Sequence, residues 1–538
     1  MRIVILVLLL LSVGLFAQEQ RNYGMGQPKT TQDLPPGQLR RNLEALPDHA
    51  KEKALKRLQR IEFPAQDIDQ LRVTPNGDIL YTDPAINEPH IPAGTLPIEP
   101  DQVLMQHSRP GSNNVLYLDF DGMVITNTWW NKNADPHVAL PFDPSGDGPE
   151  FSEDELSRIY NIWQRVSEDF AAFDVDVTTQ EPTTFTATTG RVLVTRNNDA
   201  NGVCIYYCGV GGIAYLNYFN TPDYVAKFSP ALVFWDNLTN GTASYTAEAS
   251  SHEFGHNIGL SHDGLIDSAT YYRGHGLPAD LNSWAPIMGA SYYRNVTQWS
   301  KGDYDQANNL QDDFAIIAGD LGLAPDADGI INGPGDVDTL LIEVTEAGVL
   351  AATITPVWGA YGTPLFQRRG ANLDIRALLM APDGTAQTFT DPVDTGLTFE
   401  AAVAPGRYDL QISADSSSNY STYATQGSYL TKIVITPGDP DPPENQPPEA
   451  VIDYLPSVLE YRRGRGLQIT FDGSESTDSD GQVVSYRWKI NNRLKSSTAA
   501  FTTTLRKGTY TISLAVTDDR GAEGITAQQI TVKRVMGR

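Results

Sequence analysis

Residues 245–263 of this 538-residue chain read YTAEASSHEFGHNIGLSHD, the most informative stretch of the sequence. Its small residues and helix formers predict a helix with His252 and His256 four positions apart. Residues four apart share one face of a helix, so both imidazoles can point a nitrogen at the same ion. Glu253 lies beside the first histidine, where its carboxylate can reach a water molecule near that ion. His262 can supply a third nitrogen.

Gly259 permits the left-handed backbone that ends the predicted helix and turns the chain back. Three protein nitrogens with one open position are typical of a catalytic zinc ion, whereas a structural zinc site is closed by a fourth side chain. The chain has only eight histidines, so three at this spacing favour a shared ion over unrelated core or surface histidines. We therefore expect Zn²⁺ on His252, His256 and His262, with Glu253 as the general base.

The string HExxHxxGxxHD resembles the signature of the metzincin metallopeptidases, and Asp263 after the third histidine is similar to the adamalysin (reprolysin) type. The resemblance implies an α+β catalytic domain that hydrolyses peptide bonds, with structural roles for Gly259 and Asp263. It also implies a methionine turn beneath the metal, for which Met288 in APIMGASYY stands at a suitable distance. Some metzincins place a tyrosine two residues after that methionine. This position is Ala290, so no tyrosine role is carried over.

The resemblance further implies that an extended peptide pairs with a strand just before the active-site helix. PALVFWDNL, residues 230–238, is the candidate for this edge strand. Downstream of the helix, His275 in YYRGHG is near enough in sequence to line the site. A loop histidine without a role in catalysis is the simpler interpretation.

The composition limits the classes of function. Lys and Arg total 39 against 66 Asp and Glu, and the formal charge of −27 argues against nucleic acid, because phosphates need a basic surface. Two cysteines exclude a disulfide-rich scaffold and a thiolate zinc site. Cys204 and Cys208 lie in GVCIYYCGVGG, a segment expected to be irregular. They predict a short local disulfide, with two buried thiols as the alternative.

The first residues indicate the compartment. Met1-Arg2, an apolar run from Ile3 to Leu11 and the small residue Ala17 predict a secretory signal peptide over residues 1–17. The alternative, a membrane anchor, needs about 20 apolar residues. We expect a secreted, extracellular protein with no transmembrane anchor after cleavage.

Residues 18–105 are polar and are interpreted as a propeptide-like segment, with a solvated N-terminal arm as the alternative. One helical stretch, LRRNLEALPDHAKEKALKRLQRI, carries apolar residues at helical spacing. The segment contains no cysteine, so the thiolate latch that some metzincins place on zinc is unavailable. Latency of such a zymogen would come from occlusion or from a carboxylate such as Asp83 or Asp101.

Residues 106–323 mix strand patterns, such as VLYLDF and GRVLVTR, with helical ones, which predicts an α+β (α/β-like) domain. Residues 336–437 consist of short alternating runs that predict a β-sandwich. Through GDVDTLLIEV and APGRYDLQI they resemble the bacterial pre-peptidase C-terminal domain. A Pro-rich linker covers residues 438–448.

Residues 449–536 form a second all-β module. FDGSESTDSDG, VSYRWKI and GTYTISLAVTDDRG resemble a polycystic-kidney-disease (PKD) domain, which implies an immunoglobulin-like sandwich. Trp488 is expected in its core, with an exposed aromatic used for binding as the alternative. Appended modules of these two kinds imply attachment to extracellular polymers or cell surfaces, or roles in export and maturation.

Calcium is the second metal that the sequence suggests. Four acidic loops offer oxygen ligands, but none completes the EF-hand pattern with its closing glutamate. Solvated acidic turns are the alternative at each loop. The loops are DFDG (Asp119, Asp121), FDVDV (Asp174, Asp176), DADG (Asp326, Asp328) and DSDG (Asp478, Asp480).

These observations predict a secreted zinc endopeptidase that acts on proteins or peptides. A catalytically inactive metalloprotease-derived adhesin or matrix-binding protein is the alternative from another class, and a metal hydrolase of carbohydrate or mucin linkages is a third. Intact His252, His256, His262, Glu253 and Met288 argue against decay, because loss of activity would most simply remove one of them.

Overall fold

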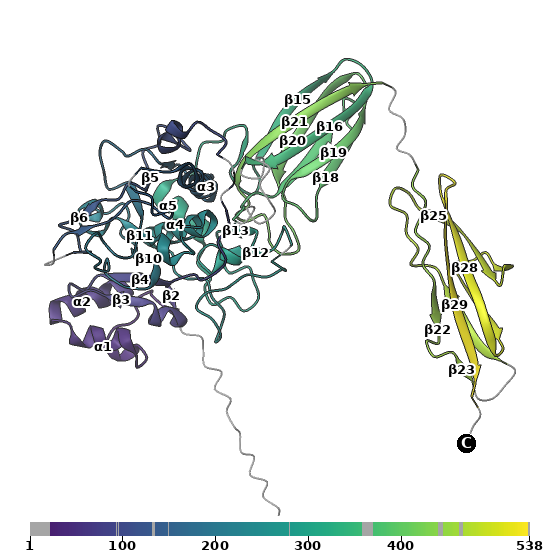
Figure 1. Ribbon diagram of the computed structural model, residues 1–538, viewed down its shortest axis with the longest axis horizontal. Coiled ribbons are helices and arrows are strands. Elements are labelled where there is room, and N and C mark those ends of the chain that lie inside the picture. The colour runs from purple at the N-terminus through teal and green to yellow at the C-terminus, as the bar shows by residue number, and fades with distance from the viewer. Residues whose placement is uncertain are drawn as a thin grey trace, which may run out of the picture. The chain divides into compact units, whose positions relative to one another are not determined.

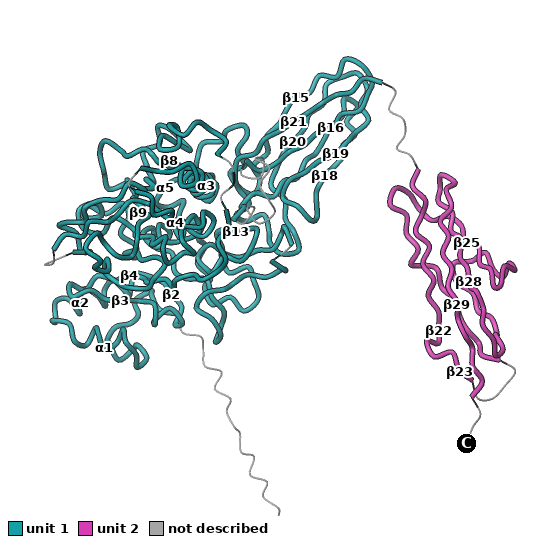
Figure 2. Tube along the Cα trace, in the orientation of Figure 1, with its two compact units in different colours: residues 1–438 teal, residues 439–538 magenta. Residues whose placement is uncertain are grey.

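The computed structural model describes two compact units, residues 1–438 and 439–538 (Figure 2). The described residues are 22–535 without Ala93, Thr95, 132–134, Pro149, Ala279, 358–369, 439–444 and 462–465. The predicted signal peptide, residues 1–17, lies outside the described residues, as does most of the predicted linker. No helix in the described part of the chain is long and apolar enough to cross a membrane.

A seven-stranded sheet forms the centre of the first unit (Figure 1). Strands β11, β9, β5 and β8 run parallel to one another. The other three strands follow with antiparallel pairings: β10 pairs with β11, β4 pairs with β10, and β3 pairs with β4. Buried, apolar strands of this kind are typical of parallel sheets covered by helices. The order is β3 (Leu71–Val73), β4 (Ile79–Pro84), β10 (Val210–Tyr215), β11 (Ala231–Phe234), β9 (Thr189–Thr195), β5 (Val115–Asp119) and β8 (Asp176–Thr178).

The strand that the sequence predicted as an edge for peptide pairing lies inside the sheet. The predicted edge strand forms β11, which is wholly buried between β10 and β9. The strand beyond it is β10, in a Gly-rich segment that the sequence predicted to be irregular. Glycine is depleted in strands, so the residue pattern concealed this one. The outer side of β10 pairs with β4 from the N-terminal segment.

The two long helices that the sequence predicted pack against each other beside the sheet. Ser152 begins α3 (Glu153–Asp169) with a capping box, because its side chain accepts from the Glu155 amide and the Glu155 carboxylate accepts from the Ser152 amide. All 16 residues of α4 (Ala243–Ile258) are buried. They contact β9, β10, β11, α3 and α5 (Asp313–Leu321).

The N-terminal helical stretch is two helices instead of one, α1 (Gln38–Ala45) and α2 (Asp48–Leu58). The break falls at Pro47, which has no amide proton and clashes with the preceding turn. A small hydrophobic core holds this segment together, and among the described residues only Leu216 joins it from beyond residue 81. Its largest members are Tyr23, Leu39, Leu43, Leu58, Phe63, Ile79 and Tyr81.

Short two-stranded ladders complete the first half of the chain. They are β1 (Asn22–Tyr23) with β2 (Phe63–Pro64), β6 (Val124–Ile125) with β7 (His137–Val138), and β12 (Trp284–Pro286) with β13 (Val296–Gln298).

Residues 330–437 form a β-sandwich of two four-stranded sheets that share one core. Strand β19 alternates buried and exposed residues and β16 alternates buried and half-buried ones, which is the pattern that predicted the sandwich. One sheet has the order β14 (Ile330–Ile331), β21 (Gly427–Pro437), β16 (Gly348–Pro356) and β19 (Leu397–Val403). The other has β15 (Val337–Val344), β20 (Gly406–Ala414), β17 (Ile375–Met380) and β18 (Ala386–Thr390).

Buried hydrogen bonds join this sandwich to the helices of the first unit. The Gln426 side chain accepts from the Ala172 amide at 2.8 Å and donates to the Asp169 carbonyl at 2.7 Å. Asn372 donates to the Asp169 carboxylate at 2.5 Å. The sandwich and the sheet with its helices therefore lie in one compact unit.

The second unit is an immunoglobulin-like sandwich of two sheets, which are antiparallel except where β23 pairs in parallel with β29. Trp488 is fully buried in its core, so it packs inside the module and is not an exposed binding aromatic. One sheet has the order β22 (Asp453–Leu455), β24 (Leu467–Asp472) and β27 (Ala500–Leu505). The other has β23 (Glu460–Tyr461), β29 (Glu523–Arg534), β28 (Gly508–Asp518), β25 (Val483–Ile490) and β26 (Arg493–Ser496).

Replacing Gln426 tests whether the first sandwich stabilises the helices. Gln426→Ala leaves the buried Ala172 amide without its acceptor, so we expect the free energy of unfolding of the first unit to fall by about 2–3 kcal/mol. Urea denaturation followed by tryptophan fluorescence measures it. Gln387→Ala, at an exposed position of β18, is the control and should change little. Equal free energies of unfolding in the two variants would contradict a stabilising role for the hydrogen bonds between the first sandwich and the helices.

Candidate metal centre

Three histidines meet at one buried point. His252 and His256 project from adjacent turns of α4, and His262 returns from the loop after the helix. The Nε2 atoms of His256 and His262 are 3.1 Å apart, and the three side chains offer nitrogens within 4.8 Å of one another. Gly259 allows the return, because it caps α4 with a φ of 123°, which side chains rarely tolerate.

Main-chain carbonyls fix the outer nitrogens of the two helix histidines. His252 Nδ1 lies 2.8 Å from the Ile287 oxygen, and His256 Nδ1 lies 2.7 Å from the Leu260 oxygen. A carbonyl only accepts, so each Nδ1 carries the proton and each Nε2 keeps its lone pair for the common point. Outer contacts of this kind orient imidazoles that bind metals.

The donor set fits a zinc ion. Two nitrogens at about 2.1 Å from a tetrahedral ion are about 3.4 Å apart, near the separation of His256 and His262. Nε2 of His252 is buried without a hydrogen-bond partner, which is costly unless a cation meets it. Both cysteines form a disulfide, so neither supplies a thiolate ligand.

Met288 lies against α4, between the turns that carry its two histidines. A Cβ added to Gly255 would come within 2.8 Å of the Met288 sulfur, so only glycine admits the methionine here. The Met288 carbonyl accepts a 2.8 Å bond from the Asp263 amide, directly after the third histidine. Because the neighbouring Ile287 carbonyl holds His252, one loop supports both ends of the histidine motif.

The Glu253 carboxylate lies against strand β10. A Cβ added to Gly212 would lie 1.9 Å from Glu253 Oε1, so only glycine lets the strand pass this close. Burial raises the pKa of the Glu253 carboxyl well above its usual range, and the charge of Asp83 raises it further. A carboxylate next to the histidines can accept a proton from water there.

A fourth side chain reaches the histidines from the N-terminal segment. Asp83, on β4, has Oδ1 3.0 Å from His262 Nε2 and 3.5 Å from His252 Nε2. Its Oδ2 lies 3.7 Å from His256 Nε2. The sequence offered Asp83 and Asp101 as candidates for such a contact. Asp101 is exposed and lies outside this cluster.

Three aromatic or acidic residues around the centre were missed in the sequence. Tyr271 donates a 2.7 Å hydrogen bond to Asp83 Oδ1, and its ring centroid lies 4.5 Å from that of His262. Tyr81 stacks on the second helix histidine and donates to Asp67 at 2.7 Å. Asp67 also accepts from the His262 amide at 3.2 Å. No local motif marks these residues, since the fold alone brings them together.

The charges at the centre are strongly coupled. Burial lowers the pKa of His256 to about 3. Burial also disfavours a charged His262, but Asp67 and Asp83 outweigh it and raise the pKa of His262 to about 9. Although burial acts the other way, the histidines hold the pKa of the Asp83 carboxyl well below its usual range. The pKa values of Asp83 and His262 are therefore shifted in opposite directions, as expected for an acidic and a basic group that attract each other.

His275 lies outside this centre. Its Nδ1 is 2.8 Å from the Tyr272 hydroxyl, and its Nε2 is 2.7 Å from the Asn419 carbonyl of the sandwich. It is therefore a loop histidine that joins two parts of the first unit.

The acidic loops differ in what surrounds them. Two already contact basic side chains, Asp119 that of Arg191 at 2.5 Å and Asp176 that of His107 at 2.6 Å. A third contributes Asp326 to a cluster with Asp336 and Asp338. The fourth, in the second unit, also meets a basic side chain, because Asp480 Oδ2 lies 3.0 Å from Arg520. Its other oxygens, Oδ2 of Asp478 and Oδ1 of Asp480, are buried without hydrogen-bond partners, and so is Oδ1 of Asn445.

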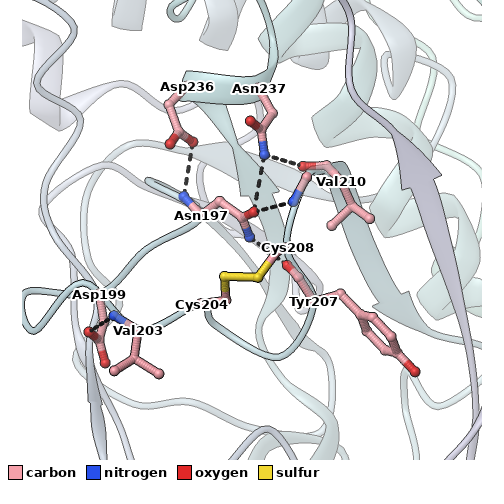
Figure 3. The surroundings of a disulfide bond; sticks show 10 residues. Asn197, Asp199, Val203, Cys204, Tyr207, Cys208, Val210, Asp236 and Asn237 are labelled. Atoms are coloured by element: carbon pink, nitrogen blue, oxygen red, sulfur yellow. Dashed lines mark hydrogen bonds between the residues drawn. A yellow bond between two sulfur atoms is a disulfide. The ribbon is translucent and has the colours of Figure 1, made fainter.

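The two cysteines form the predicted disulfide, Cys204–Cys208 (Figure 3). Asn197 holds the closed loop from inside, since its side chain donates to the Tyr207 carbonyl and accepts from the Gly209 amide, each at 2.7 Å. The loop directly precedes β10. It thus fixes the start of the strand that passes Glu253.

Comparisons with known proteins match the C-terminal region. The PKD domain family matches residues 458–533. The collagenase ColA of Clostridium perfringens is 33% identical over 111 residues, which cover 20% of this chain and 10% of the collagenase. The pre-pro-metalloprotease PrtV of Vibrio cholerae is 45% identical over 58 residues, 11% of this chain and 6% of PrtV. The chain thus spans about a tenth or less of these relatives.

Among solved structures, the PKD1 domain of Vibrio anguillarum Epp is 35% identical, with a TM-score of 0.14, and covers 17% of this chain and 100% of its own. The PKD1 domain of the V. cholerae metalloprotease PrtV is 34% identical, also with a TM-score of 0.14. This match covers 16% of this chain and 99% of the PrtV domain. The match to the family model shows that the C-terminal region of this chain contains a PKD domain.

Proposed function

We propose that this chain is an exported, zinc-dependent endopeptidase that hydrolyses peptide bonds of proteins. The observation that carries the proposal is the convergence of three oriented imidazoles at one buried point with Glu253 beside them. The resemblance of HExxHxxGxxHD to the metzincin signature supports it. The relatives named as a collagenase and a metalloprotease support an association with proteolysis through the C-terminal region.

The residues divide the work of the reaction among them. A zinc ion on His252, His256 and His262 would supply Lewis-acid chemistry for attack on an amide carbonyl. Glu253 would accept a proton from the attacking water and pass it to the leaving amine. The Ile287 carbonyl contacts Nδ1 of His252 and keeps that imidazole oriented. The lone pair on Nε2 of His252 would therefore stay directed at the metal position throughout the reaction.

Glu253→Gln tests the assignment of the base. The amide cannot accept the proton, so hydrolysis of casein or gelatin should fall about a hundredfold to ten-thousandfold. Zinc content, measured by atomic emission, should stay near one ion per chain. Hydrolysis and zinc content are both measured before and after limited proteolysis. The control variant is Glu181→Gln, at an exposed position. Undiminished, chelator-sensitive turnover in Glu253→Gln would overturn the role of Glu253, and a wild-type chain without turnover would favour the inactive adhesin.

We also propose that the DSDG loop of the second unit binds Ca²⁺. Partnerless buried oxygens of Asp478, Asp480 and Asn445 are the supporting observation, because such groups are costly unless a cation or donor meets them. The turn is tight, since a Cβ on Gly481 would lie 2.6 Å from Asp478 Oδ2 and 2.4 Å from Asp519 Oδ1. Carboxylate and amide oxygens are the ligands that Ca²⁺ prefers.

Calcium binding should stabilise the second unit. In calorimetry of the full chain, Ca²⁺ at about 1 mM, a concentration suited to extracellular modules, should raise the unfolding temperature of this unit. Asp480→Asn should reduce that rise, whereas Asp453→Asn, at an exposed position of β22, should not. The same rise in both variants would count against the site.

We propose that the PKD domain attaches the enzyme to insoluble protein or to a cell surface. The family match and the compactness of residues 439–538 as a separate unit support a module with its own role.

Removal of the second unit separates attachment from catalysis. A chain ending at Gly438 should keep its turnover of soluble casein but bind insoluble collagen or elastin several-fold more weakly in a pull-down assay. Unchanged binding would contradict attachment through this unit.

A further inference from the structure

One segment of the first sandwich lies directly against the loop that supports the metal centre. Gly370 and Ala371 precede β17, and the amides of both donate to the Asn295 carbonyl, at 3.1 and 3.0 Å. The Ala371 carbonyl accepts in turn from the Thr297 amide at 2.8 Å. The sandwich segment therefore pairs with β13, which itself pairs with β12.

From β13 the contacts continue to the first helix histidine. The Gln298 carbonyl of β13 accepts from the Ile287 amide at 2.9 Å. The Ile287 carbonyl lies 2.8 Å from His252 Nδ1, a contact that orients the imidazole. The Gln298 side chain also donates to the Asn372 carbonyl at 2.7 Å, which adds a second bond between β13 and the sandwich segment. The path from the sandwich to His252 thus runs through β13 and Ile287 alone.

A second contact reaches α4 at Glu248, one helical turn before His252. The Thr297 hydroxyl of β13 donates to Glu248 Oε1 at 3.0 Å. A Cβ added to Gly370 would lie 2.4 Å from the same oxygen and 2.8 Å from Arg165 Nη1. The φ of Gly370 is +90°, which side chains rarely adopt. Only glycine therefore lets the segment approach the buried Glu248 carboxylate so closely.

We propose that the first sandwich is a working part of the metal centre, in which residues 370–372 hold β13 and Glu248 so that His252 keeps its orientation. The sequence implied attachment or export for this module, roles that need no contact with the catalytic helices. Glu248 and Gln298 are positioning residues, because they act on the metal ligand through other groups. The active chain therefore has to retain residues 330–437. The inference rests on the metal centre of the proposed function, but its test measures metal binding.

Gly370→Ala tests the coupling in the full chain. The added methyl group displaces the segment from Glu248, so transfer of zinc to a chromophoric chelator should be about tenfold faster. The visible spectrum of the Co²⁺-loaded chain should also change, because the imidazole is no longer held in place. The matched control is Gly384→Ala, in the turn between β17 and β18 of the same sandwich. Gly384 has a similar φ of +86° but open space around an added Cβ, so this variant should match wild type.

Two substitutions at Thr297 separate loss of the contact from loss of the fold. Thr297→Val keeps the shape of the side chain but cannot donate to Glu248, whereas Thr297→Ser keeps the hydroxyl. Zinc transfer should be faster and the Co²⁺ spectrum altered in Thr297→Val, by a smaller factor than in Gly370→Ala. Thr297→Ser should stay near wild type. Circular dichroism checks that each variant is folded.

The outcomes distinguish the coupling from the proposed activity. Equal transfer rates and equal Co²⁺ spectra in wild type and Thr297→Val would overturn the coupling, even if Gly370→Ala fails to fold. The same changes in Gly384→Ala as in Gly370→Ala would also overturn it, since strain in any turn of the sandwich would then suffice. The expected metal-binding changes without hydrolysis of casein by the wild-type chain would uphold the coupling and overturn the endopeptidase.

Discussion

The burial of helix α4 is the constraint on which the rest of the first unit depends. All 16 of its residues are buried, although it carries two histidines, two glutamates and several hydroxyl groups. Polar groups in such a place are costly unless each finds a partner. The Ile287 carbonyl serves His252, and the hydroxyls of Ser291 and Thr297 donate to Glu248 at 2.6 and 3.0 Å. The elements around α4 therefore provide hydrogen-bond partners for its polar groups as well as apolar contacts.

This requirement explains the place of the first sandwich. Ser251 of α4 donates to Asp169 of α3, whose carboxylate also accepts from Asn372 of the first sandwich. Gln426 adds a bond to the Asp169 carbonyl. A module that the sequence presents as an appendage thus supplies buried partners to the helices behind the metal centre. The second unit has a core of its own, which agrees with a separate role.

The close approach of α4 to β10 links the fold to the chemistry. Gly212 leaves room for the Glu253 carboxylate, and Gly255 leaves room for Met288 on another side of the same helix. Each glycine lets two elements meet at a distance that a side chain would forbid. The Glu253 carboxylate, the histidines and strand β10 are therefore held close together in one small volume. The N-terminal segment fills the remaining side of that volume through Tyr81 and Asp83.

The sequence by itself determined the elements whose signals are local. The spacing of His252, His256 and His262, the cap at Gly259, the alternating runs of both sandwiches and the short Cys204–Cys208 loop all depend on neighbours within a few residues. The sequence-based prediction was wrong at two places where glycine or proline outweighed the pattern of apolar residues. Pro47 divides one predicted helix into two, and the glycines of β10 made this strand look like an irregular segment. In both cases a backbone property outweighed the side-chain pattern.

Only the tertiary structure decided what completes the centre. Asp67, Asp83 and Tyr271 are far in sequence from the helix histidines, and Asp83 could not be chosen over Asp101 from composition or spacing. Sheet pairing selected it: once β4 lies antiparallel on β10, alternation along the strand turns Tyr81 and Asp83 to the histidine side. Local patterns specify which groups can bind a metal, but strand register specifies which distant group meets them, because register depends on the whole sheet.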